Sequence, residues 1–287
     1  MRRRSIRTIE YPLDVDGVIT RVLEAGSGDD YIVMVHGVGA RADRWRLNLQ
    51  SLATTGRHAF AFDLPGHGFA SKGGGFDYSL QGYTHFLEQL LTRLDVQSTA
   101  LSGTSLGGHV SARFACDHPG RVTALILIGS LGLSALGSDL RSRIARAIRD
   151  TSPQGIEQKL RALVHDPALV TREWIDEEWR VNNSKGAGEG FDLLAQYFTD
   201  HIDEEVLLGD LRQISSDVPI LIVWGREDKI LPASVGEAAG RVLTKAQIEL
   251  VEGAGHAPYL ERAAEFNVVV AEFLASLLAS RRDELGP

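Results

Sequence analysis

The chain contains very little cysteine. Cys116 is the single cysteine among 287 residues. One cysteine cannot form a disulfide within the chain, and it cannot build a cysteine-rich zinc site. We therefore expect neither a disulfide within the chain nor a cysteine-rich zinc site.

The chain also lacks an excess of basic residues. Lys and Arg number 30 against 38 Asp and Glu, which gives a formal net charge of −8 at pH 7. A nucleic-acid-binding protein presents a basic face to the phosphates, so we expect no nucleic-acid partner. Long apolar runs are missing as well, and none approaches the roughly 18 residues of a membrane span. No apolar segment typical of a signal peptide follows the arginines at 2–4, so we expect a cytoplasmic protein with no membrane partner.

What is present is an alternation of short β-branched runs with longer helical patterns. With 44% hydrophobic residues, the chain can fold around a large core. Strands are predicted at 6–11, 18–24, 31–35, 59–62, 99–102, 122–128, 218–224 and 248–251, and helices at 79–94, 106–117 and 257–278. This alternation is typical of an α/β protein whose mostly parallel sheet has helices on both faces.

The alternation is interrupted over 131–216. This stretch shows helical patterns such as 140–149 and 174–180, but no convincing buried strand. We predict that it forms a helical cap (lid) over the carboxyl ends of the strands, the edge where ligands bind in open α/β sheets. Residues 1–130 and 217–287 are then expected to form the core domain.

The segment 103–107 reads Gly-Thr-Ser-Leu-Gly and fits the pattern G-x-S-x-G. An apolar run typical of a strand precedes it and a helical pattern follows it, which is the context that the pattern requires. Glycines on both sides of the serine allow a sharp turn that exposes the hydroxyl above the sheet. Ser105 is therefore the predicted nucleophile.

A serine nucleophile needs a base, and His256 lies in a glycine-containing loop after the last predicted strand. An imidazole titrates near neutral pH, so it can accept the serine proton and return it later. Asp228 follows the strand at 218–224 and is the predicted carboxylate that orients the histidine, with Glu227 as its local competitor. The order serine, aspartate, histidine along the chain is the order expected for this arrangement.

Two backbone amides are predicted to form an oxyanion hole, which holds the negative charge that develops on the reacting oxygen. The turn at 36–39 follows the strand at 31–35 and can direct the amide of Val38 at this oxygen. The amide of Leu106, at the start of the helix after the serine, is its predicted partner.

Five motifs together resemble the α/β-hydrolase superfamily over nearly the whole chain. They are HGVG at 36–39, DLPGHG at 63–68, GTSLGG at 103–108, GRED at 225–228 and GH at 255–256. The resemblance implies an eight-stranded, mostly parallel sheet flanked by helices, in which the second strand is antiparallel and a helical cap follows the sixth strand. It implies neither an organic cofactor nor a metal.

Within this superfamily, Ser105 sets aside the members similar to epoxide hydrolases and haloalkane dehalogenases, which carry an aspartate nucleophile. The chain is more similar to a capped group that includes meta-cleavage-product hydrolases, enol-lactonases and small carboxylesterases. The meta-cleavage enzymes usually have asparagine before the nucleophile and tryptophan after the histidine, where this chain has Thr104 and Ala257. They also hold the substrate carboxylate with a cap arginine, and Arg180 lies near such a place.

The leading hypothesis is a serine hydrolase that cleaves an ester or lactone bond of a small, partly apolar substrate through an acyl-enzyme. The alternative is hydrolysis of a carbon–carbon bond in diketone acids of the meta-cleavage type, with the same triad. A minor alternative is a non-catalytic small-molecule receptor or a lyase on the same fold. The expected partner is a small-molecule substrate, and the sequence leaves homo-oligomerisation open.

Candidates for substrate contact come from the turn at 36–39, the surroundings of the nucleophile and the aromatic residues of the cap. The predicted substrate-binding residues are Gly37, Gly39, Trp45, Thr104, Trp174, Trp179, Arg180 and Phe198. Aromatic residues at helical spacing usually pack inside a protein, so we expect only one or two of these rings to touch the ligand.

Overall fold

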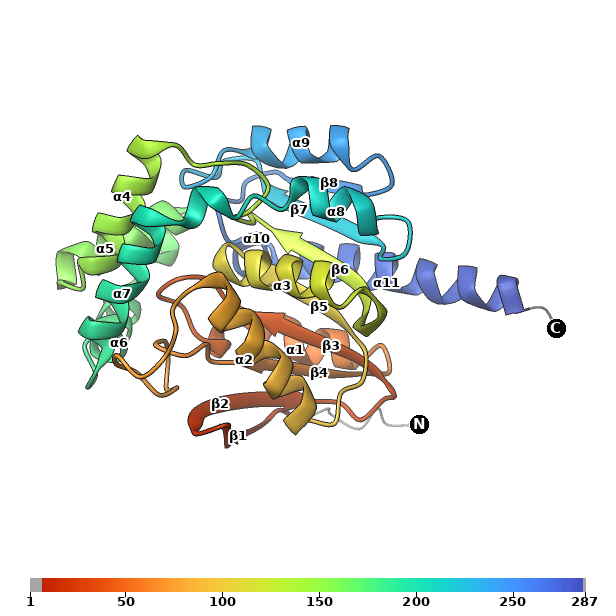
Figure 1. The fold of residues 1–287 in the computed structure, drawn as a ribbon, viewed down its shortest axis with the longest axis horizontal. Helices are drawn as coiled ribbons and strands as arrows, with labels where there is room; N and C mark the ends of the chain where they lie inside the picture. Colours follow the sequence, from red (N-terminus) through yellow and green to blue (C-terminus); the bar gives the residue numbers. More distant parts are fainter. Residues whose placement is uncertain (1–6, 286–287) are drawn as a thin grey trace.

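The computed structural model describes residues 7–285, which contain an eight-stranded sheet (Figure 1). The strands are β1 (Ile9–Val15), β2 (Val18–Ala25), β3 (Asp30–Val35), β4 (Arg57–Phe62), β5 (Thr99–Thr104), β6 (Val122–Ile128), β7 (Ile220–Gly225) and β8 (Gln247–Val251). Their order across the sheet is β1-β2-β4-β3-β5-β6-β7-β8. Strand β2 runs antiparallel to both of its neighbours, and the other pairings are parallel. The predicted mostly parallel sheet with an antiparallel second strand is confirmed.

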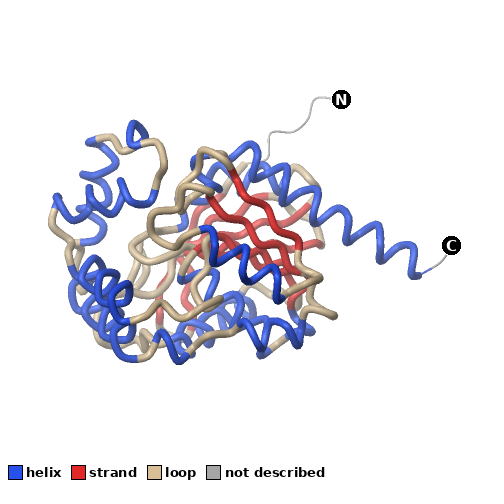
Figure 2. Tube along the Cα trace, turned by 90° about the horizontal axis from the view of Figure 1, so that it is seen from above, coloured by secondary structure: helices blue, strands red, loops and turns tan. Residues whose placement is uncertain are grey.

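Helices cover both faces of this sheet (Figure 2). The helices around it are α1 (Arg46–Ala53), α2 (Leu80–Arg93), α3 (Leu106–Asp117), α9 (Ala233–Val242), α10 (Pro258–Glu261) and α11 (Ala263–Leu285). Side chains that alternate along a strand point to opposite faces of the sheet. In β3, Val33 and Val35 pack with α2 and α3, whereas Ile32 and Met34 pack with α1 and α11. Burial on both faces therefore explains the continuous apolar run of this strand.

The first strand is displaced relative to its prediction at 6–11, of which position 6 lies outside the described residues. Strand β1 continues to Val15 because the reversal of the chain occurs only at Asp16 and Gly17, with φ values of 50° and 85°. The Asp14 carboxylate accepts the Gly17 amide at 2.8 Å and closes this turn.

The C-terminal helical segment also differs from the prediction. The pattern predicts one helix over 257–278, but the structure has two helices, α10 and α11, separated at Arg262. The backbone of Arg262 leaves the helical region, with φ −123° and ψ 44°. Its Nε donates to the Gly253 carbonyl oxygen at 3.2 Å, which ties the break to the loop after β8. Within residues 7–285, no helix combines the length and the apolar content needed to cross a lipid bilayer.

Helices fill the interval between β6 and β7, where the sequence predicts the cap. They are α4 (Ser138–Arg149), α5 (Pro153–Leu163), α6 (Arg172–Asn182), α7 (Ala187–Asp200) and α8 (Leu208–Ile214). In Figure 1, α4 to α7 lie together beyond one end of the sheet, and α8 returns to the body beside α3. The hydroxyls of Ser152 and Thr171 accept backbone amides in the first turns of α5 and α6, which fixes where these helices begin. The helical insertion after the sixth strand is confirmed, and its limits at 131 and 216 stay a prediction.

Candidate active site

Ser105 occupies the sharp turn between β5 and α3. Its backbone has φ 53° and ψ −117°, a conformation that costs free energy in a residue with a side chain. The turn is compact because its two flanking glycines have no side chain. A Cβ atom on Gly103 would lie 2.2 Å from the Gly107 carbonyl oxygen, and one on Gly107 would lie 2.2 Å from the Val35 carbonyl oxygen. The strained turn presents the serine side chain above the carboxyl end of the sheet, as the pattern requires.

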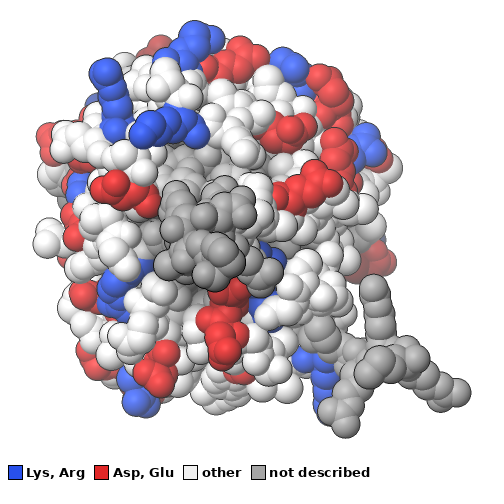
Figure 3. Space-filling model, turned by 90° about the vertical axis from the view of Figure 1, so that its right-hand side faces the viewer, with Lys and Arg blue, Asp and Glu red and all other residues white. Residues whose placement is uncertain are grey.

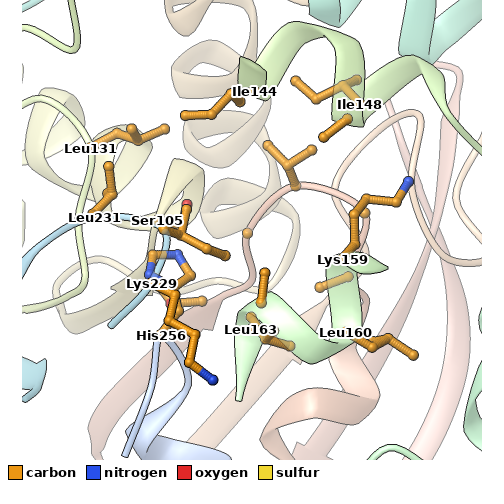
Figure 4. A pocket seen from close by; sticks show the side chains of 18 of the residues that line it. Ser105, Leu131, Ile144, Ile148, Lys159, Leu160, Leu163, Lys229, Leu231 and His256 are labelled. Atoms are coloured by element: carbon orange, nitrogen blue, oxygen red, sulfur yellow. The ribbon is translucent and has the colours of Figure 1, made fainter. Parts of the chain in front are cut away.

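His256 and Asp228 form a close pair beside this serine. The Nδ1 atom of His256 lies 2.6 Å from Oδ2 of Asp228, and their side chains are 4% and 0% exposed. The other carboxylate oxygen, Oδ1, accepts the amides of Ile230 and Leu231 at 2.8 and 2.9 Å. An ionised carboxylate only accepts hydrogen bonds, so Nδ1 carries the proton and Nε2 is left for a substrate or for Ser105. Figure 4 shows the imidazole of His256 next to Ser105.

The competing carboxylate has a different contact. Glu227 accepts the Ala254 amide through Oε2 at 3.1 Å, and this bond fixes the loop that leads to His256. Of the two candidate acids, Asp228 is the one that the structure brings to the histidine. The Glu227 carboxylate instead binds the backbone of the loop at Ala254.

Gly129 leaves the space that this pair occupies. It follows β6, where the sequence offers no carboxylate, and it has a φ of 47°. A Cβ atom here would lie 3.0 Å from both Cε1 and Nδ1 of His256 and 3.4 Å from Oδ2 of Asp228. A side chain at this position would therefore press on the imidazole.

The turn after β3 places Val38 in the lining of the cavity that Ser105 and His256 also line. Among residues 7–285, the Val38 amide has no hydrogen-bond acceptor. The turn is braced by His36, whose Nε2 accepts the Leu64 amide at 2.9 Å and whose Nδ1 therefore donates to the Gly37 carbonyl oxygen at 2.8 Å. Burial lowers the pKa of His36 to about 3, so the ring stays neutral and structural. The oxyanion hole formed by Val38 and Leu106 stays a prediction.

A cavity of about 330 Å³ opens above Ser105 and His256. The body and the cap both build its wall, and most of the cap residues come from α4 and α5. The lining side chains of α4 are Leu140, Arg143, Ile144, Ala147 and Ile148, and those of α5 are Ile156, Lys159, Leu160, Ala162 and Leu163. Their spacing of three to four residues places them on one face of each helix. The apolar faces of two cap helices thus form a hydrocarbon-lined chamber over the serine.

The structure separates the predicted substrate-binding residues into two groups. Gly37, Gly39, Thr104 and Phe198 line the cavity together with Val38, Ser105 and His256, whereas Trp45, Trp174, Trp179 and Arg180 are not among its lining residues. Trp45 is fully buried and stacks on Tyr259 with ring centroids 4.3 Å apart. Trp179 is 37% exposed, and the guanidinium of Arg180 lies over its ring at 6.0 Å.

The rotation of α6 about its own axis explains why Trp179 and Arg180 do not line the cavity. Its residues that line the cavity are Glu178 and Asn182, four positions apart and hence on one face. Trp179 and Arg180 lie about 100° and 200° around the helix from Glu178 and so point elsewhere. The ring of Trp174 packs on the guanidinium of Arg44 at 4.4 Å, and its Nε1 donates to Glu178 at 3.3 Å. It therefore supports residues of the cavity wall.

Sequence reasoning missed the charged side chains of the cavity wall. The lining includes four cationic side chains and one carboxylate, namely Arg44, Arg143, Lys159, Lys229 and Glu178. Glu178 is 2% exposed and accepts Nη1 of Arg41 at 2.8 Å and Nη2 of Arg44 at 2.7 Å, which joins the cap to the body. Burial lowers the pKa of Lys159 to about 8. The sequence does show a cluster of arginines at 41, 44 and 46 after the turn. The cluster does not tell which of the three side chains faces the cavity.

Residues 7–285 contain no cluster of three or more His, Cys, Asp or Glu side chains arranged to hold a metal ion. His67 lies in the motif at 63–68 and His109 directly follows the motif at 103–108, and both are buried outside the cavity lining. Nδ1 of His67 lies 3.0 Å from the Pro65 carbonyl oxygen, and Nε2 of His109 lies 2.7 Å from that of Glu205. Burial lowers their pKa values to about 3 and about 4, which keeps both rings neutral.

Comparison with known proteins identifies the family of this chain. Residues 30–263 match the family described as the alpha/beta hydrolase fold. The chain is 34% identical to the dihydrolipoyllysine-residue acetyltransferase component of an acetoin cleaving system from Pseudomonas putida, over 91% of this chain and 68% of that protein. It is 26% identical to a 2-hydroxy-6-oxononadienedioate/2-hydroxy-6-oxononatrienedioate hydrolase from Cupriavidus pinatubonensis, over 88% and 89% of the two chains.

Solved structures are similar in fold. A serine hydrolase from the bacterium Cycloclasticus zankles superposes with a TM-score of 0.85 at 22% identity, covering 94% of this chain and 99% of that one. A membrane phospholipase A superposes with a TM-score of 0.81 at 25% identity, covering 94% and 86%. Together with the family match and the 34% identical relative, these similarities show that the chain belongs to the α/β-hydrolase family.

Proposed function

We propose that the protein hydrolyses an ester or lactone bond of a small, partly apolar substrate through the triad Ser105, His256 and Asp228. The observation that carries this proposal is the 2.6 Å pair of His256 and Asp228 at the same cavity as a serine in a strained turn. A buried carboxylate fixes the tautomer of the imidazole and stabilises its protonated form. The hydrocarbon wall from α4 and α5 supports a substrate with an apolar part.

The proposed reaction begins when His256 Nε2 accepts the Ser105 proton and Oγ attacks the carbonyl carbon. The amides of Val38 and Leu106 stabilise the negative charge on the carbonyl oxygen. His256 then gives its proton to the departing alkoxide oxygen, which leaves an acyl-enzyme on Ser105. Water attacks the acyl carbon with His256 as the base, and the acid leaves as the serine is regenerated.

A second candidate is hydrolysis of a carbon–carbon bond in diketone acids of the meta-cleavage type. It is supported by the names of similar proteins, which include 2-hydroxy-6-oxo-2,4-heptadienoate hydrolase from Pseudomonas putida at 25% identity. The cationic side chains in the cavity also suit an acidic substrate. The same triad would act after the enol of the substrate has been converted to its ketone form.

The test compares p-nitrophenyl esters of increasing acyl length with a meta-cleavage-type diketone acid, each with the wild-type protein and with Ser105→Ala. Esterase function predicts turnover of at least one ester, with kcat reduced on the order of a million-fold in the variant. Turnover of the diketone acid alone would select the second candidate. If Ser105→Ala keeps more than a small fraction of activity, the acyl-enzyme mechanism is wrong. Ligand binding without turnover of any substrate would point to a receptor.

A further inference from the structure

The cap contacts the body at the two loops that hold the proposed catalytic groups. Asn182 of α6 donates to the Gly39 carbonyl oxygen at 3.4 Å, in the turn after β3. The end of α5 accepts a backbone hydrogen bond from the loop of His256. On the outer face opposite the cap, by contrast, basic and acidic side chains are interspersed (Figure 3). The contacts that join the cavity wall to the proposed catalytic groups therefore lie at the cap end of the molecule.

His256 is held from two sides. Its side chain contacts Asp228 of the body at 2.6 Å. Its backbone amide donates at 2.8 Å to the carbonyl oxygen of Leu163, the last residue of α5. The carbonyl groups in the last turn of a helix have no partner within the helix, so this bond satisfies a group that α5 leaves open. The position of the histidine backbone thus depends on where the cap helix ends.

The loop of His256 and the end of α5 lie too close together for a side chain at Gly255. A Cβ atom on Gly255 would lie 2.8 Å from the backbone nitrogen of His165 and 2.9 Å from the Leu163 carbonyl oxygen. Glycine is the residue that permits such a close approach of two backbone segments. The two segments therefore pack as one unit.

Glu261, the last residue of α10, joins these two segments through a single carboxylate. Its Oε1 accepts the Gly255 amide at 2.7 Å. Its Oε2 accepts the His165 amide at 2.6 Å and the Asp166 amide at 3.3 Å. Hydrogen bonds from amides to an ionised carboxylate are stronger than those between neutral groups. One side chain thus fixes the histidine loop and the cap segment relative to each other.

We infer that Glu261 is a positioning residue for the proposed reaction, because it clamps the loop of His256 to the end of α5. The inference rests on the proposed function and adds to it a residue that does not line the cavity. Leu160 and Leu163 of α5 do line the cavity, as Figure 4 shows. The helix that an apolar part of the substrate contacts therefore also sets the position of the imidazole. Substrate contact with α5 is in this way coupled to proton transfer at His256.

The test compares Glu261→Gln and Glu261→Asp with the wild-type protein on its best p-nitrophenyl ester. Glutamine has one carbonyl oxygen and no charge, whereas aspartate keeps the charge but is one methylene shorter, so neither side chain can bridge both segments. In both variants kcat should fall by about tenfold with little change in KM, because a small displacement of the imidazole impairs proton transfer more than binding.

Glu265→Gln is the matched control, because Glu265 is an exposed carboxylate in the first turn of α11. It is expected to keep the wild-type kcat. Unchanged kcat in both Glu261 variants would overturn the inference. A loss in Glu261→Gln alone would also overturn it, since the effect would then come from the charge and not from the bridge.

Hydrogen exchange keeps the inference testable if no ester is hydrolysed, in which case the proposed function fails separately. NMR measures the protection of the His256 amide, whose acceptor is Leu163 and not Glu261. In both Glu261 variants this protection should fall by about tenfold, because the bond to Leu163 opens more often once the clamp is lost. Glu265→Gln should leave the protection unchanged. Unchanged protection of the His256 amide in the Glu261 variants would overturn the inference, even if the Gly255 amide exchanges faster.

Discussion

The body and the cap build the same cavity by different means. The body contributes residues held by the backbone, namely Ser105 in a strained turn and His256 in a loop whose amide donates to the Leu163 carbonyl oxygen at 2.8 Å. The cap contributes the faces of amphipathic helices, attached to the body through the buried Glu178. The comparison teaches that local backbone geometry positions the proposed catalytic residues, whereas the shape of the cavity depends on how whole helices are placed.

The largest expected effect lies in the body. Asp228→Asn keeps the shape of the side chain but no longer fixes the imidazole tautomer, so kcat should fall by about 10⁴-fold. Glu227→Gln is the matched control, since it changes the neighbouring carboxylate that contacts only the Ala254 amide. Steady-state kinetics on the preferred ester measures both variants, and the control should stay within about threefold of the wild type. A loss of similar size in Glu227→Gln would mean that the two acids act as one structural unit.

The attachment of the cap should be the next most sensitive feature. Glu178→Gln removes a buried carboxylate from two arginines, and breaking a buried ion pair typically costs about 3–5 kcal/mol. Glu177→Gln is the control, because Glu177 is 60% exposed and Arg41 is its one ion-pair partner within residues 7–285, so its loss should cost less than about 1 kcal/mol. Urea unfolding gives both free energies of unfolding. Equal free energies of unfolding for the two variants would show that the cap is not anchored at Glu178.

A smaller effect is expected at Gly129, where the body leaves room for the pair of His256 and Asp228. Gly129→Ala would place a methyl group 3.0 Å from the His256 ring, at a position with positive φ. A small displacement of the imidazole should lower kcat by about 10- to 100-fold with little change in KM. Gly120→Ala is the control, since a Cβ atom there meets nothing within 4 Å. Unchanged kcat in Gly129→Ala would show that the pair tolerates a side chain beneath it.

The same division between body and cap separates what the sequence could and could not predict. Helix α3 and strand β6 occur at the residues predicted, because their ends are set by local motifs and apolar runs. The pair of His256 and Asp228 followed from the order of residues after two strands, since parallel strands end at one edge of the sheet. The cap residues could not be chosen in this way. Trp179 and Glu178 are neighbours in sequence, and only the packing of α6 on the body decides which one faces the cavity.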